Sequence, residues 1–221
     1  MAEKGVMIEY DFAVIDGASL LYNTTENFLR ELDGIPFDSV IEARHFAGGD
    51  YQSCFAKYFP IVKTKKTALK AGRDLDAAFR KALEAEIVKG VPQSFVEFVR
   101  ELVSRQIKVV ISTRADLAKL GDAFAAFPVH GIVYRHEEST VYGSVRWEVW
   151  RRICIQTRVD PRNAVAATGS GLGVKAALRG GLGAVAVTNP RTAYQDYTGC
   201  DEFFTQLDAA AARRIMEILK V

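Results

Sequence analysis

The feature that most constrains the fold is an alternation of amphipathic helical segments and short apolar runs that begins after Pro92. The amphipathic segment 94–105 precedes the apolar run 108–111, and the same order recurs to the end of the chain. Further helices are predicted at 117–126, 144–157 and 174–179, and further strands at 131–134, 164–167 and 183–187. Such alternation buries the strands between helices and predicts an α/β fold with a doubly wound parallel sheet. Ligands of such sheets bind at the carboxyl ends of the strands.

An earlier apolar run, Phe12-Ala13-Val14-Ile15, ends at Asp16-Gly17 and predicts a central strand that leads into a tight turn. Residues 18–89 have helical periodicity instead, with helices predicted at 22–32, 55–59 and 75–88. A segment of this length between two strands is better explained as an inserted domain than as a loop. We therefore predict an α/β core from residues 1–17 and 90–221, with a helical cap from residues 18–89.

Composition excludes several classes of protein. The chain has 221 residues and a formal net charge of +2, so no overall attraction to nucleic acid or to an anionic membrane is expected. Its apolar runs are far shorter than the roughly 20 residues that cross a bilayer. Residues 1–10 lack an apolar signal core, which favours a cytoplasmic location. The three cysteines, Cys54, Cys154 and Cys200, lie far apart and indicate neither a zinc site nor a disulfide framework.

The order of these segments resembles the haloacid dehalogenase superfamily, in particular its branch of phosphoglycolate phosphatases and β-phosphoglucomutases. The resemblance covers nearly the whole chain and rests on residues 12–24, 91–92, 108–112, and 159–161 together with 173–182. Its most specific part is Val159-Asp160-Pro161 followed by Gly173-Val174-Lys175-Ala176-Ala177. It implies a Rossmann-like core with an inserted helical cap.

The resemblance also implies a chemistry, the hydrolysis of a phosphate ester through a covalent aspartyl-phosphate. A carboxylate at the end of the first strand attacks phosphorus, and a second carboxylate two residues later protonates the leaving group. A Ser or Thr and a Lys hold the phosphoryl oxygens, while carboxylates bind Mg²⁺.

Most of these groups are missing at the positions that the resemblance assigns. The nucleophile position falls on Val14 and the acid/base position on Asp16. The lysine position falls on Ser144, and the metal-binding acid falls on Gly169. The sequence therefore predicts no metal site, and Mg²⁺ is expected only if other groups rebuild one.

Some candidates for a remaining site can be named. Asp16 is the remnant acid/base, although an Asp before Gly also fixes a turn without any catalytic role. Asp11 is rejected as a nucleophile, because three residues upstream of Val14 in a strand is about 10 Å away. Hydroxyl groups that could hold a phosphate or another ligand are predicted at Ser112, Thr113, Thr168 and Ser170. The last two belong to a glycine-rich turn before a helix, which can bind an anion.

The leading hypothesis is a catalytically impaired homologue of these hydrolases that binds a small anionic ligand or a partner between core and cap, without a cofactor. An active phosphatase-like hydrolase with relocated groups is the alternative. A homo-oligomer is a third interpretation, and the helix that carries Trp147 and Trp150 has the composition of an interface.

Overall fold

The computed structural model describes residues 3–33, 36–47, 49–58, 65–116, 132–135 and 145–221. Its core is a six-stranded sheet with the order β3-β2-β1-β4-β5-β6. Every neighbouring pair of strands is parallel. The strands are β1 (Gly5–Glu9), β2 (Lys108–Thr113), β3 (Ile132–Arg135), β4 (Ala164–Thr168), β5 (Gly183–Val187) and β6 (Glu202–Phe204). The predicted α/β fold class is thus confirmed.

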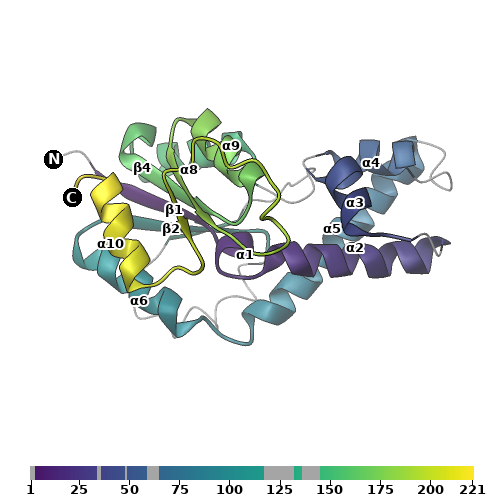
Figure 1. The fold of residues 1–221 in the computed structure, drawn as a ribbon, viewed down its shortest axis with the longest axis horizontal. Coiled ribbons are helices and arrows are strands. Elements are labelled where there is room, and N and C mark those ends of the chain that lie inside the picture. Colours follow the sequence, from purple (N-terminus) through teal and green to yellow (C-terminus); the bar gives the residue numbers. More distant parts are fainter. Residues whose placement is uncertain (1–2, 34–35, 48, 59–64, 117–131, 136–144) are drawn as a thin grey trace.

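Helices cover both faces of the sheet (Figure 1). One face packs on α6 (Gln93–Ser104) and α10 (Ala209–Ile218), and the other packs on α8 (Trp147–Thr157) and α9 (Gly171–Gly180). Because side chains alternate along a strand, Val6 and Ile8 of β1 face α6 and α10, whereas Met7 faces α8 and α9. Both faces of β1 are therefore buried, as a central strand requires.

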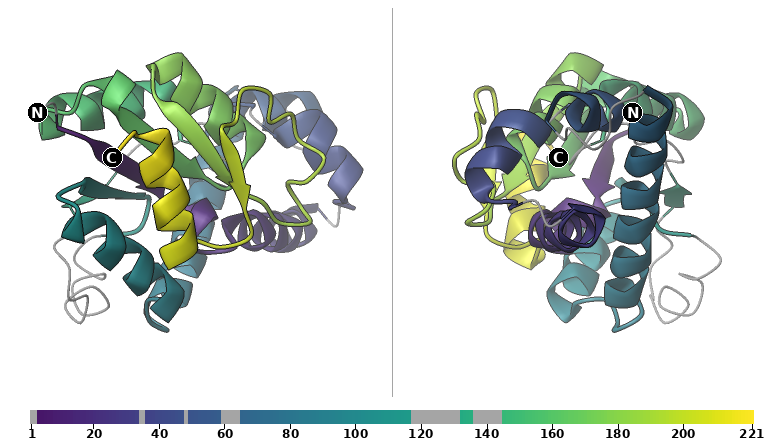
Figure 2. Two further views of the ribbon diagram at one scale, coloured as in Figure 1. Left: turned by 60° about the vertical axis from the view of Figure 1, so that its left-hand side comes forward. Right: turned by 90° about the vertical axis from the view of Figure 1, so that its right-hand side faces the viewer.

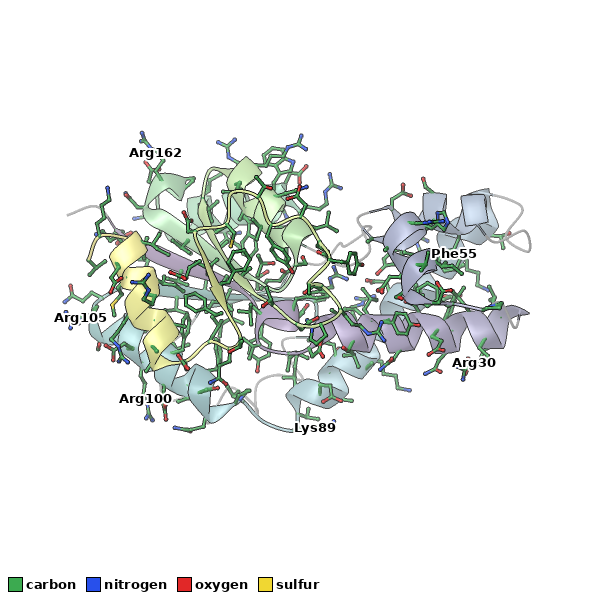
Figure 3. The ribbon with its side chains drawn as sticks, in the orientation of Figure 1. Arg30, Phe55, Lys89, Arg100, Arg105 and Arg162 are labelled. Atoms are coloured by element: carbon green, nitrogen blue, oxygen red, sulfur yellow. The ribbon has the colours of Figure 1, made fainter. Side chains whose placement is uncertain are left out.

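A helical layer projects from the end of the core opposite the chain termini (Figure 1). It is formed by α2 (Gly17–Asp33), α3 (Ser39–Ile41), a π-helical turn (Glu42–Phe46), α4 (Tyr51–Tyr58) and α5 (Lys65–Ile87). The right-hand view of Figure 2 looks along α2 from this side. We call these helices the cap. Its own hydrophobic cluster includes Leu29, Phe46 and Phe55, and Figure 3 shows Phe55 among the cap helices.

Helix α5 belongs to both layers. Its residues Leu75 and Phe79 lie in the cap cluster, while Leu83 and Ile87 lie in the core cluster with α6 and the sheet. One uninterrupted helix thus joins the two hydrophobic clusters.

The first strand differs from the prediction. The strand predicted at 12–15 is wrong, because β1 spans Gly5–Glu9 and is followed by a short helix, α1 (Tyr10–Ala13). Beyond it, the Val14 amide still donates to the Tyr10 carbonyl over 3.1 Å. The physical reason is that the strand buries a carboxylate, Glu9, which made this run look less apolar than 12–15.

The remaining predicted elements within the described residues are present. Most of their ends differ from the prediction by at most five residues, but α5 begins at Lys65, ten residues before the predicted start. The sequence pattern does not predict α3, the π-helical turn, β6 or α10, and the helix predicted at 117–126 lies outside the described residues. In the part of the chain that the structure describes, none of the helices combines the length and apolar character needed to span a membrane.

Candidate functional site

Two carboxylates lie at the carboxyl edge of the sheet, where its central strands end. Glu9 is the last residue of β1, and Asp11 follows two residues later in α1. Thr113 ends the neighbouring strand β2, and Thr168 ends β4 on the other side. All four residues have no exposed surface.

Glu9 is held by two donors from distant parts of the chain. The Val145 amide donates to Oε1 over 2.9 Å, and the Thr168 hydroxyl donates to Oε2. Burial raises the pKa of Glu9 to about 7, and these two hydrogen bonds together with the Arg114 charge oppose that rise. Glu9 therefore binds a proton near neutral pH.

Asp11 has a matching set of partners on the β2 side. The Thr113 hydroxyl donates to Oδ1 over 2.5 Å, and the Arg114 amide donates to Oδ2 over 2.8 Å. Burial raises the pKa of Asp11 to about 6, against the hydrogen bond from Thr113 and the charge of Arg114. Each oxygen of both carboxyl groups thus accepts a hydrogen bond from a donor within the chain.

The nucleophile and acid/base positions were predicted at Val14 and Asp16, after a strand that the structure does not contain. In the structure, Glu9 and Asp11, and not Val14 and Asp16, are the residues at the end of the first strand and two positions beyond it. The rejection of Asp11 placed it within the first strand, upstream of the strand's end, and this placement is wrong, because Asp11 lies in α1 beyond the end of β1. The missed signal was the pair of acids two residues apart directly after the apolar run Val6-Met7-Ile8.

Asp16 itself is exposed and has a structural role. Its Oδ1 accepts a hydrogen bond from the Ser19 amide over 3.1 Å, which caps the first turn of α2. The Asn189 side-chain amide donates to the same oxygen over 3.3 Å. Val14 is half-buried against the core cluster.

The predicted hydroxyl groups separate into different roles. Thr113 and Thr168 bind the two carboxylates, and Ser112 is fully buried beside Glu9 in the register of β1 and β2. The Ser170 hydroxyl accepts from the Gly173 amide over 3.0 Å and caps α9. Ser144 lies outside the described residues.

Gly169 leaves no room for a metal-binding side chain. A Cβ atom at this position would stand 2.0 Å from the Phe12 carbonyl oxygen and 2.8 Å from the Phe12 Cβ. Among the described residues, no group of three or more His, Cys, Asp or Glu side chains could hold a metal ion. These residues therefore do not fit the Mg²⁺ site that the resemblance implies.

A small cleft lies between core and cap, beside this buried site. Its volume is about 30 Å³, which is room for one water molecule. Cap residues such as Leu21 and Glu42 form one wall, and core residues such as Ser170 and Arg191 form the other. The guanidinium of Arg191 lies 3.5 Å from the centre of the Tyr22 ring on α2.

A larger cavity, of about 170 Å³, lies on the α6 side of the same strand ends. It is lined by residues 12–16, the first turn of α6, the end of β5 and the segment that leads into α10. Its polar lining includes Asp16 and Asn189, which are hydrogen-bonded to each other. Phe12 lines both this cavity and the cleft, so the α1 segment separates them.

Solved structures with a similar fold cover almost the entire chain. β-Phosphoglucomutase from Clostridium difficile aligns over 99% of this chain and 97% of its own, with a TM-score of 0.70 and 12% identity. A haloacid dehalogenase-type hydrolase of family IA from Entamoeba histolytica aligns over 99% and 100%, with a TM-score of 0.71 and 12% identity. A phosphonoacetaldehyde hydrolase-like protein from Oleispira antarctica aligns over 100% and 94%, with a TM-score of 0.69 and 12% identity.

No family model matches the sequence, and a search of curated proteins gives no match. At these identities the comparisons concern the fold. The chain has the fold of haloacid dehalogenase-like hydrolases, as in β-phosphoglucomutase, and the expected resemblance is confirmed at that level.

Proposed function

We propose that this chain, which has the haloacid dehalogenase-like fold, lacks efficient phosphatase activity and binds a small anionic ligand in the cleft between core and cap. The observation that carries this proposal is the state of the two carboxylates. Glu9 and Asp11 are both fully buried, and each accepts two hydrogen bonds from the chain itself. A nucleophile must reach its substrate, and these oxygens are directed to internal donors.

Gly169, on the other side of the site, also argues against efficient phosphatase activity. Phosphoryl transfer depends on a cation that neutralises the developing charge. The backbone of Phe12 occupies the space that an acid at position 169 would need. No catalytic step through a metal ion is therefore assigned to these residues.

The cleft supports ligand binding because it brings charged groups of both layers to one place. Arg191 comes from the core and Glu42 from the cap. The Arg191 cation favours an anion, and the hydroxyl groups of Ser170 and Thr192 line the same wall. With a volume of about 30 Å³, the cleft must widen before a ligand enters.

An active hydrolase remains the second candidate, and one observation favours it. Glu9 and Asp11 stand two residues apart after the first strand, which is the spacing that the resembling family requires. Glu9 would then replace the usual aspartate as nucleophile, and Asp11 would be the acid/base.

Hydrolysis of a panel of phosphate esters, with and without Mg²⁺, distinguishes the two candidates. We expect no release of phosphate above that of a Glu9→Gln variant. Glu31→Gln, on the exposed surface of α2, is the matched control. Mg²⁺-dependent turnover that Glu9→Gln and Asp11→Asn abolish, but Glu31→Gln does not, would establish the active hydrolase.

Ligand binding is tested by thermal shift with inorganic phosphate, a sugar phosphate and a small carboxylate as probes. A ligand that binds the folded chain raises its melting temperature with concentration. We expect Arg191→Gln to remove the shift and Arg152→Gln, which alters an exposed arginine on α8, to retain it. A shift that both variants retain would place the ligand elsewhere.

A further inference from the structure

One core residue, Arg114, is inserted between the core and the cap. It follows the end of β2, and its amide donates to Asp11. Its side chain is only 2% exposed, which is unusual for an arginine. The guanidinium carbon lies 5.8 Å from the Phe12 ring centre and 5.5 Å from that of Phe79 on α5.

Charged and polar groups of both layers surround this guanidinium. On the core side, its charge acts on Glu9 and Asp11 and opposes the rise of their pKa values. On the cap side, it acts in the same direction on Tyr51 of α4 and Asp76 of α5. A buried charge is tolerated only with such partners. The arginine therefore interacts with carboxyl groups of the core and, at the same time, with a phenol and a carboxyl group of the cap.

A second contact connects the same segment to the cap. The amide of Asp116, two residues after Arg114, donates to Glu84 Oε1 on α5 over 3.2 Å. Ala115, between them, is fully buried in the core cluster. The segment after β2 is therefore attached to α5 through both a side chain and the backbone.

We propose that Arg114 is a latch that holds the cap against the core. Moving the cap away would separate the guanidinium from Phe79, Tyr51 and Asp76 while it stayed attached to Asp11 through its own backbone. The charge would then lose its cap-side partners and ring contacts together. In the chain without ligand, the cap is accordingly expected to hold one position relative to the core, and the distance measurement below tests this whether or not a ligand binds in the cleft.

The test is a spin-label distance measurement in the full chain. Labels are placed at Ala56→Cys on α4 and Ala210→Cys on α10, both exposed, in a Cys200→Ser background. The other cysteines, Cys54 and Cys154, are buried. We expect one narrow distance distribution in this background, and a broader distribution shifted to longer distances in Arg114→Met.

Arg100→Met is the matched control, because Arg100 is exposed on α6 and projects from the core (Figure 3). Arg114→Lys keeps the charge but not the planar group that lies over the rings, and an intermediate distribution is expected. An Arg114→Met protein that is folded and gives the distribution of the control would overturn the proposal. A merely structural arginine would lower the melting temperature and leave the distances unchanged.

If Arg114→Met does not fold, the same contact is tested from the cap. Tyr51→Phe combined with Asp76→Asn removes the polar partners of Arg114 on the cap and leaves the Phe79 ring and the contacts to the core in place. We expect this double variant to broaden the distances as well. An unchanged distribution in the double variant would also overturn the latch.

Discussion

The carbonyl oxygen of Phe12 lies 2.0 Å from the place that a Cβ atom would take at Gly169. The α1 segment and the turn after β4 therefore meet through backbone atoms. This contact occupies the space that a side chain at position 169 would need, and the resemblance implies a metal-binding acid at this position.

Gly169→Ala is expected to destabilise the folded chain by about 3 kcal/mol, at the upper end of the usual cost of overpacking. The reason is that the Phe12 backbone must move to admit even one methyl group. Denaturant unfolding measures the loss. Gly180→Ala is the control, since its nearest neighbour, 3.1 Å away, is the end of the Leu182 side chain. Equal stabilities of Gly169→Ala and wild type would contradict the close contact.

Replacing Glu9 by Gln is expected to change how stability depends on pH. Burial raises the pKa of folded Glu9 from 4.5 to about 7, so its contribution is fully present below about pH 4.5 and is lost as the pH rises through 7. Gln does not ionise, so no buried charge forms as the pH rises. Its side-chain oxygen can accept from the Val145 amide, and its side-chain amide can donate to the Thr168 hydroxyl. Above pH 8, the free energy of unfolding of the Glu9→Gln variant should exceed that of wild type by up to about 3 kcal/mol.

Urea unfolding at pH 5 and pH 8 measures this difference. Asp11, whose pKa rises to about 6, should leave part of the pH dependence in the variant. Glu31→Gln serves again as the exposed control and should follow wild type at both values. A Glu9→Gln protein with the pH profile of wild type would show that Glu9 does not titrate in this range.

Thr113→Val is expected to lower stability by about 1–3 kcal/mol, the usual cost of leaving a buried polar group without its partner. The Thr113 hydroxyl donates to Asp11 and accepts from the Ala115 amide over 3.1 Å. Thr113→Ser retains the hydroxyl and should restore most of the loss. Thermal unfolding of both variants checks the order, and a Ser variant as unstable as the Val variant would attribute the effect to packing instead.

Asp16→Ala is expected to cost about 1 kcal/mol, as the loss of a helix N-cap does. Asp16→Ser, which can still accept from the Ser19 amide, should be close to wild type. If Asp16 had the acid/base role first assigned to it, Ser and Ala would be equally impaired in any hydrolysis assay. Equilibrium unfolding and the phosphate-ester panel together separate these roles.

The sequence predicted the layers of this fold better than its chemical centre. Runs such as Val109 to Ile111 are apolar on both faces, which is a local signal for a buried strand. The strand that ends at Glu9 lacks this signal, because it contains an acid. The buried carboxylate is stabilised by donors from Val145 and Thr168, which are more than 130 residues away in the chain. Partners so distant in sequence do not affect the local hydrophobic pattern. The pattern therefore predicts the first strand at the uncharged run 12–15 instead.

Gly169 illustrates a different limit. The sequence shows that no acid stands there, but only the position of the Phe12 backbone shows that none would fit. Likewise, the sequence places Arg114 directly after a strand, without any indication that its side chain lies between Phe12 and Phe79. Contacts between layers depend on the distance between elements, which hydrophobic periodicity does not contain.

Helix α5 carries a consequence for how the chain unfolds. Leu75 and Phe79 complete one hydrophobic cluster, and Leu83 and Ile87 complete the other, on successive turns of the same helix. Fraying of this helix would therefore expose apolar surface in both layers at once. We therefore expect core and cap to unfold as one cooperative unit, and calorimetry should record a single heat-absorption peak whose van't Hoff and calorimetric enthalpies agree.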